Sequence, residues 1–150
     1  MDLIKQTVSQ ISNKYQSNEP GEIAAHRNVL VLYEELGDVF GYFNTFNRIQ
    51  MIHINHSLEK EMQRFVMAHE LGHSLLHSNL NTPFMKRYTL FAVDRIEREA
   101  NRFAVELLLP DALLEDGMSL YDAAAISGVP KELACLKSLP KNINLSAFQP

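Results

Sequence analysis

The residues best suited to chemistry in this 150-residue chain are His69, Glu70 and His73, which form the pattern H-E-x-x-H. On an α-helix the two imidazoles stand one turn apart and can bind one metal ion, while the glutamate between them faces the water to be activated. A helical wheel places both histidines at the edge of the apolar stripe, where an unpaired imidazole is costly to bury. One histidine there would be an ordinary core residue, but the pair with its glutamate predicts a zinc site.

A catalytic zinc site takes three protein ligands, so a third ligand must come from elsewhere in the chain. The metzincin extension of the motif requires glycine at position 76 and histidine at position 79, where this chain has Leu76 and Asn79. A gluzincin instead takes a glutamate from a later helix packed on the first. The helix expected over residues 94–109 offers two, Glu97 and Glu99.

Glu97 lies closer than Glu99 to the apolar face of that helix, at about 60° against about 100° from its centre. A capping box with Asp94 would explain Glu97 without a metal. Asn101 favours the ligand role, because it follows one turn later on nearly the same face and could hydrogen-bond a metal-bound histidine or the carboxylate itself. We therefore predict Glu97 as the third ligand, Asn101 as the residue that orients a ligand, and Glu99 as the alternative carboxylate.

His77 extends the row of histidines, but it lies about 12 Å along the helix axis from His69 and cannot share the same metal ion. The plain interpretation is a surface histidine or one that hydrogen-bonds a ligand. Peptide hydrolysis would also need a donor that stabilises the oxyanion. Tyr88 and His77 are the candidates for this role, and spacing selects neither.

The elements that must position these residues follow from apolar periodicity. Helical spacing predicts helices over residues 3–15, 22–26, 58–77, 94–109 and 119–127, with another beginning at Pro130. Ser57 is available as the N-cap of the motif helix. Apolar and β-branched runs predict strands over residues 29–33, 40–46 and 49–55, the last two joined by a hairpin at Asn47 and Arg48, and residues 78–86 read as a loop.

These elements predict an α+β fold of the zincin-like, gluzincin type. A small antiparallel sheet packs on the motif helix, and short C-terminal helices follow it. We expect one domain over residues 1–150, with a catalytic core to about residue 110 and a helical tail from about 111.

Composition narrows the possible partners and the compartment. The formal net charge of −4 argues against tight binding to a phosphate backbone, so no direct nucleic-acid partner is expected. A single cysteine, Cys135, excludes an internal disulfide and a cysteine-rich zinc cluster. The first residues have no signal-peptide pattern, and no apolar run approaches about 18 residues. We expect a cytoplasmic protein without membrane contact.

The segment 69–77, followed by the segment 97–110, resembles the ImmA/IrrE family of bacterial and mobile-element metallopeptidases. The likeness covers about residues 20–140. It implies a gluzincin-type zinc endopeptidase with one Zn²⁺ per chain, His69, His73 and Glu97 as ligands, and Glu70 as the catalytic glutamate. It also implies a helix-turn-helix repressor as substrate, whose inactivation releases genes of a prophage or mobile element. Larger members carry a further sensor-like domain, and the end at Pro150 is typical of the short, mobile-element form.

Three functions compete on this basis. The first is site-specific cleavage of a repressor, and the second is a metal-containing binding module that inactivates the repressor by sequestration. Glu70 favours the enzyme, because a structural site has no use for a base. The third is a DNA-binding regulator, since residues 123–133 have a helix-turn-helix pattern. The would-be recognition helix offers only Lys131, Lys137 and Lys141, which favours a packing or substrate-docking role for the tail.

Overall fold

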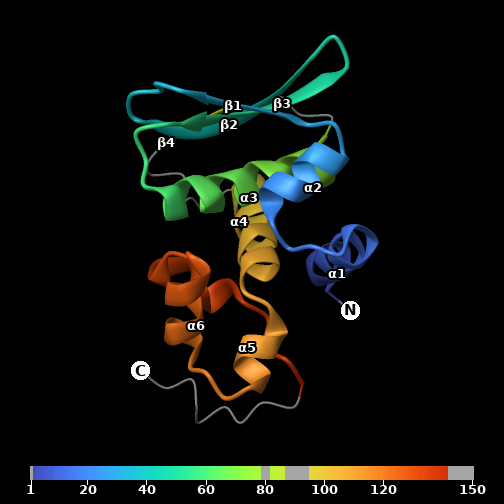
Figure 1. The fold of residues 1–150 in the computed structure, drawn as a ribbon, viewed down its shortest axis with the longest axis vertical. Helices are drawn as coiled ribbons and strands as arrows, with labels where there is room; N and C mark the ends of the chain where they lie inside the picture. The colour runs from blue at the N-terminus through green and yellow to red at the C-terminus, as the bar shows by residue number, and fades with distance from the viewer. Residues whose placement is uncertain (1, 79–81, 87–94, 142–150) are drawn as a thin grey trace.

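A computed structural model describes residues 2–78, 82–86 and 95–141, the segment 82–86 by its backbone alone. Its helices lie on one face of a four-stranded sheet (Figure 1). The elements in chain order are α1 (Leu3–Tyr15), α2 (Pro20–His26), β1 (Leu30–Glu34), β2 (Val39–Phe46), β3 (Ile49–Asn55), α3 (Lys60–Leu76), β4 (Thr82–Lys86), α4 (Arg95–Leu108), α5 (Asp111–Glu115), α6 (Leu120–Ser127) and the 3₁₀ helix η2 (Lys131–Leu136). The described chain contains no helix with the length and apolar composition needed to cross a bilayer.

The sheet is mixed, so the prediction of an antiparallel sheet is wrong. The strand order is β1-β3-β2-β4, with β1 parallel to β3 and the other pairs antiparallel. The chain reverses between Glu34 and Val39, and again at the predicted hairpin, where Asn47 and Arg48 take positive φ. After two reversals β3 must run in the direction of β1, and β1 joins the free edge of β3. The hairpin itself is confirmed.

β4 corrects the prediction of a loop over residues 78–86. Residues 82–86 pair with β2, in irregular register, and form the edge of the sheet next to β2. An edge strand tolerates Pro83, because a proline there need not donate to a further strand. Pro83 and the polar residues before it interrupt the alternation of apolar and polar residues, so the sequence pattern does not indicate this strand.

α3 runs beneath the sheet and forms the centre of the core. Its buried apolar side chains, among them Phe65 and Leu71, pack with Phe43, Ile52 and Ile54 of the sheet. The helix begins at Lys60, two residues later than predicted, and Ser57 is not its N-cap. The Ser57 hydroxyl instead donates to the Glu35 carboxylate at 2.8 Å.

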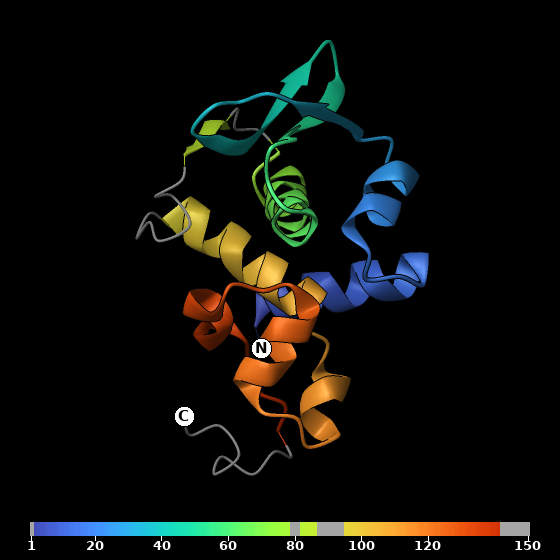
Figure 2. The ribbon, with the colours of Figure 1, turned by 60° about the vertical axis from the view of Figure 1, so that its left-hand side comes forward.

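Two glycines allow the close approaches on either side of α3. A Cβ on Gly41 of β2 would lie 2.6 Å from the His53 carbonyl oxygen and 2.7 Å from Cγ1 of Val66 on α3. A Cβ on Gly72 of α3 would lie 3.0 to 3.2 Å from three atoms of the Phe103 side chain on α4. Helix α3 is therefore held tightly between the sheet and α4, which crosses below it (Figures 1 and 2).

The tail begins with α5, which was not predicted from the sequence, and continues with α6 as predicted. The Ser119 hydroxyl caps α6 by accepting from the Asp122 amide, and Gly128 ends it in the left-handed conformation. The following element, η2, is a 3₁₀ helix preceded by Pro130, where an α-helix was expected. The Arg64 guanidinium of α3 donates to the Ser127 carbonyl at 2.9 Å and ties the tail to the core.

We predict that Gly41→Ala lowers the free energy of unfolding by about 1–3 kcal/mol, the usual cost of overpacking a rigid site. The matched control is Gly21→Ala in α2, where the new Cβ would meet only the Met67 sulfur at an ordinary 3.5 Å. That variant should be neutral or slightly stabilising, because alanine favours a helix. Urea unfolding measures both, and equal effects would contradict the packing argument.

Candidate metal centre

Three of the predicted site residues meet where α4 crosses α3. One ligand atom each of His69, His73 and Glu97 lies within 4.8 Å of the others. The Glu97 carboxylate spans the pair, with Oε2 at 2.9 Å from Nε2 of His69 and Oε1 at 3.0 Å from Nε2 of His73. Both imidazoles are buried, and the carboxylate keeps 12% of its side-chain surface exposed. The arrangement is a nearly closed cluster with one accessible side.

Helix geometry and the α3–α4 contact explain this convergence. His69 and His73 are four residues apart on α3, so their rings lie side by side with centroids 4.8 Å apart. Gly72 sits between them in the sequence and lets Phe103 of α4 approach the helix closely. The N-terminal turn of α4, which carries Glu97, is thereby brought against both rings.

Several buried polar atoms at this point lack a hydrogen-bond partner among the described residues. They are the two carboxylate oxygens of Glu70, Nε2 of His77, and Nε2 of His73, whose contact with Glu97 lacks hydrogen-bond geometry. Unpartnered buried polar atoms are costly and call for an explanation, such as an ion. Two imidazoles and one carboxylate are a donor set that suits zinc. The residues present therefore fit a metal ion of this kind.

The two carboxylates of the site have opposite protonation preferences. Burial raises the pKa of Glu70 to about 8, assisted by the negative charge of Glu97. Burial also raises the pKa of Glu97, but the imidazoles of His69 and His73 outweigh it and lower that pKa to about 2. At neutral pH Glu97 is thus an anion that can act as a ligand. Glu70 with a pKa of about 8 is mostly protonated at neutral pH, and it is able to take up and release a proton in that range.

Asn101 lies where the sequence reading expects it. Its side-chain oxygen is 2.7 Å from Nδ1 of His69, on the side of the ring away from Glu97. Since amide oxygens only accept, Nδ1 carries the proton, and Nε2 keeps its lone pair directed toward the cluster. This tautomer is the one that a metal at the cluster requires.

The other candidates lie outside the cluster. Glu99 pairs with Arg95 at 2.9 Å and faces His77, and within the described part of the chain it makes no ion pair with His69 or His73. His77 lies behind His73, with 3.1 Å between their Nδ1 atoms, and burial lowers its pKa. Tyr88 falls outside the described residues, as does Asp94, the proposed capping partner of Glu97.

A second polar cluster was not predicted. The buried His53 of β3 contacts Glu34 at 3.2 Å and Asn44 at 2.9 Å, and it stacks on Tyr42 with ring centroids 4.1 Å apart. The alternation of His53 with Ile52 and Ile54 puts it on the open face of the sheet. Its neighbours depend on strand register, which the sequence alone does not reveal.

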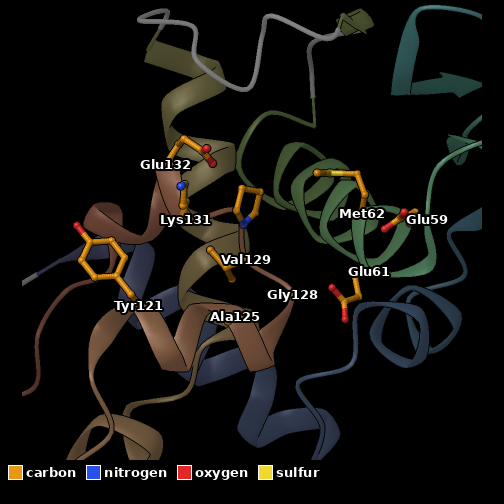
Figure 3. Close-up of a pocket in the computed structure, with 10 residues that line it drawn as sticks. Glu59, Glu61, Met62, Tyr121, Ala125, Gly128, Val129, Lys131 and Glu132 are labelled. Atoms are coloured by element: carbon orange, nitrogen blue, oxygen red, sulfur yellow. The ribbon is translucent and has the colours of Figure 1, made fainter. Parts of the chain in front are cut away.

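A pocket of about 480 Å³ lies away from the metal cluster, between the start of α3 and the α6–η2 segment (Figure 3). Its walls combine apolar side chains, such as Met62 and Val129, with charged ones, such as Glu61 and Lys131. None of His69, Glu70, His73 or Glu97 lines it. The candidate metal centre therefore lies at a packed helix crossing. The pocket is a separate feature and does not identify this centre.

Comparison with known proteins shows the family to which the chain belongs. The profile of the family described as IrrE N-terminal-like domain matches residues 24–137. The chain is 44% identical over 142 residues to immunity region protein 2 of Bacillus phage phi105, covering 91% of this chain and 90% of the phage protein. It is also 33% identical over 135 residues to metallopeptidase ImmA of Bacillus subtilis strain 168, covering 85% of this chain and 79% of ImmA.

We predict that the purified protein takes up about one zinc ion per chain, because the three donor groups converge on one point. His69→Ala and His73→Ala should abolish uptake. His56→Ala, which removes an exposed histidine that pairs with Glu35 and lies outside the cluster, should not change it. Elemental analysis after gel filtration measures the content. Wild-type protein that folds yet binds no zinc would contradict the assignment.

The choice between the two carboxylates is tested by Glu97→Ala and Glu99→Ala. Glu97→Ala should remove the third donor and weaken zinc binding far more than Glu99→Ala, because only Glu97 contacts both imidazoles. Competition with a chromogenic chelator measures the two affinities. The reverse order would show that Glu99 is the ligand.

Proposed function

Because the chain belongs to the ImmA/IrrE family of metallopeptidases, we propose that it is a zinc-dependent endopeptidase of gluzincin type. In this proposal His69, His73 and Glu97 are the zinc ligands and Glu70 is the catalytic residue. The observation that carries it is the unpartnered, fully buried carboxylate of Glu70 beside the three converging donor groups. A structural metal site would have no use for such a group.

In this proposal, different residues of the chain carry out the separate steps of peptide hydrolysis. A zinc ion bound to the three ligands supplies Lewis-acid chemistry and favours deprotonation of water near neutral pH. Glu70 takes the proton from the attacking water and returns it to the amine that leaves when the peptide bond breaks. The positive charge of a metal held by the three ligands would favour the ionised form of Glu70, in which the carboxylate can accept a proton. Asn101 holds His69 in the tautomer that binds metal.

The substrate we propose is a helix-turn-helix transcriptional repressor, cleaved at a specific site. Two relatives support a role of this kind, one named for a phage immunity region and the other named metallopeptidase ImmA. Cleavage would make the protein an anti-repressor of a prophage or mobile element. It would act in the cytoplasm, where such a repressor meets its operator.

The tail supports a protein partner better than a nucleic acid. Of its lysines, Lys137 is 1% exposed and pairs with the buried carboxylate of Glu106 at 2.9 Å, so it is not available to a phosphate. Lys131 stands beside Glu132 and faces a pocket that Glu61 also lines (Figure 3). A DNA backbone would meet net negative charge there. We therefore propose that the tail, as part of a single domain, packs on the core and contributes to docking of the substrate.

We predict that Glu70→Gln retains zinc, fold and affinity for the repressor, since the amide has the same volume and is not a ligand. Cleavage should fall at least about 10²-fold, the usual scale for losing a positioned proton acceptor. The control is Glu22→Gln, an exposed position of α2. The assay is co-expression with a helix-turn-helix repressor chosen from genes near that of this protein, followed by intact-mass analysis of that repressor.

Sequestration is the alternative that this assay separates. If the wild type relieves repression while the repressor stays full length, and Glu70→Gln relieves it equally well, the protein is a metal-containing binding module. Cleavage by the wild type and by Glu22→Gln, but not by Glu70→Gln, supports the peptidase.

A further inference from the structure

We propose that His77 is a positioning residue that holds the metal ligand His73 in its binding tautomer, with Glu99 facing His77 from α4. This inference rests on the proposed zinc site and gives a role to two residues that the ligand set leaves unused. It does not require the protein to cleave any particular substrate.

The contact is between the outward-facing nitrogens of two histidines on consecutive turns. Nδ1 of His73 lies 3.1 Å from Nδ1 of His77, while Nε2 of His73 faces Glu97. For Nε2 to offer a lone pair to a metal, the ring proton of His73 must sit on Nδ1. The Nδ1–H of His73 therefore donates to Nδ1 of His77. An imidazole that donates in this way is fixed in orientation and becomes a stronger ligand.

The placement of His77 favours one of the roles that its spacing allows. Only 9% of its side chain is exposed, so it is not a surface histidine. It contacts His73 through Nδ1, whereas Nε2 of His73 faces Glu97, so His77 lies on the side of the ring away from the cluster. That position suits support of the ligand.

The backbone holds His77 in this position, and Glu99 faces its outer nitrogen. Its amide donates the last helical hydrogen bond to the His73 carbonyl at 2.8 Å, and its φ of −133° takes the chain out of α3 at that residue. With the Nδ1 lone pair engaged, Nε2 of His77 carries the proton and faces Oε2 of Glu99 at 3.6 Å, a charge contact that is too long for a hydrogen bond. Arg95 contacts the other oxygen of Glu99 at 2.9 Å. A chain of polar groups thus leads from the ligand to the exposed side of α4.

Both histidine ligands then have the same kind of support. Asn101 accepts from Nδ1 of His69 at 2.7 Å, and His77 accepts from Nδ1 of His73 at 3.1 Å. The first partner comes from α4 and the second from the end of α3. The two rings are therefore fixed independently, and losing one partner should not misplace the other ring.

The experiment compares two replacements of His77 in the full-length protein. His77→Leu removes the acceptor, whereas His77→Asn keeps an oxygen near the position of Nδ1. His56→Leu is the matched control, because His56 also faces a glutamate at 3.6 Å but does not contact a ligand. Chelator competition measures zinc affinity, and long-range ¹H–¹⁵N NMR spectra of the zinc-loaded protein report the tautomer of His73.

We expect His77→Leu to bind zinc about 10- to 100-fold more weakly and to lose the Nδ1–H signal of His73. His77→Asn and His56→Leu should remain close to the wild type in both measurements. Unchanged affinity of His77→Leu, or an equal loss in His77→Asn, would overturn the proposal and leave His77 a packing residue. A wild type that binds zinc but does not cleave would refute the peptidase and leave this inference intact, whereas a wild type that binds no zinc would refute both.

Discussion

The close crossing of α3 and α4 is the constraint on which the rest of the structure depends. Phe103 packs against Gly72, where a side chain would find neighbouring atoms at 3.0 to 3.2 Å. Because this contact lies between the two histidines of the motif, it determines how near the first turn of α4 comes to them. A glutamate 28 residues beyond His69 reaches that imidazole only because two helices are in contact at a residue without a side chain.

The same packing buries most of the site, and this burial decides its electrostatics. Glu70 and Glu97 are chemically identical groups in one site, yet burial dominates the pKa of the first and contact with the imidazoles dominates the pKa of the second. Water at the site would weaken both effects by screening the charges. The surroundings of each carboxylate therefore suit Glu70 to the proposed role of base and Glu97 to the proposed role of ligand.

The sheet and the tail support the crossing from either side. The sheet packs closely on α3 at Gly41 of β2. The tail contacts α3 through the hydrogen bond from Arg64 and contacts α4 through the buried ion pair of Lys137 and Glu106. A buried ion pair of this kind contributes little net stability, but breaking it by removing one partner is costly. It therefore holds the tail in one position against α4.

The sequence by itself determined the features that rest on local spacing. The motif helix, the hairpin at Asn47 and Arg48, and the cap and terminus of α6 all follow from neighbours within a few residues, and the structure contains them. The preference for Glu97 over Glu99 as the carboxylate near the histidines also came from the sequence. Both residues lie on one helix that faces α3, so their angles on its helical wheel can be compared directly. Only the tertiary structure decided the parallel pairing of β1 with β3, the strand at residues 82–86, and the place of His77 behind His73. These depend on which edge of a sheet is free and on how a side chain turns at a helix end, and such choices are made by packing between segments that are distant in the chain.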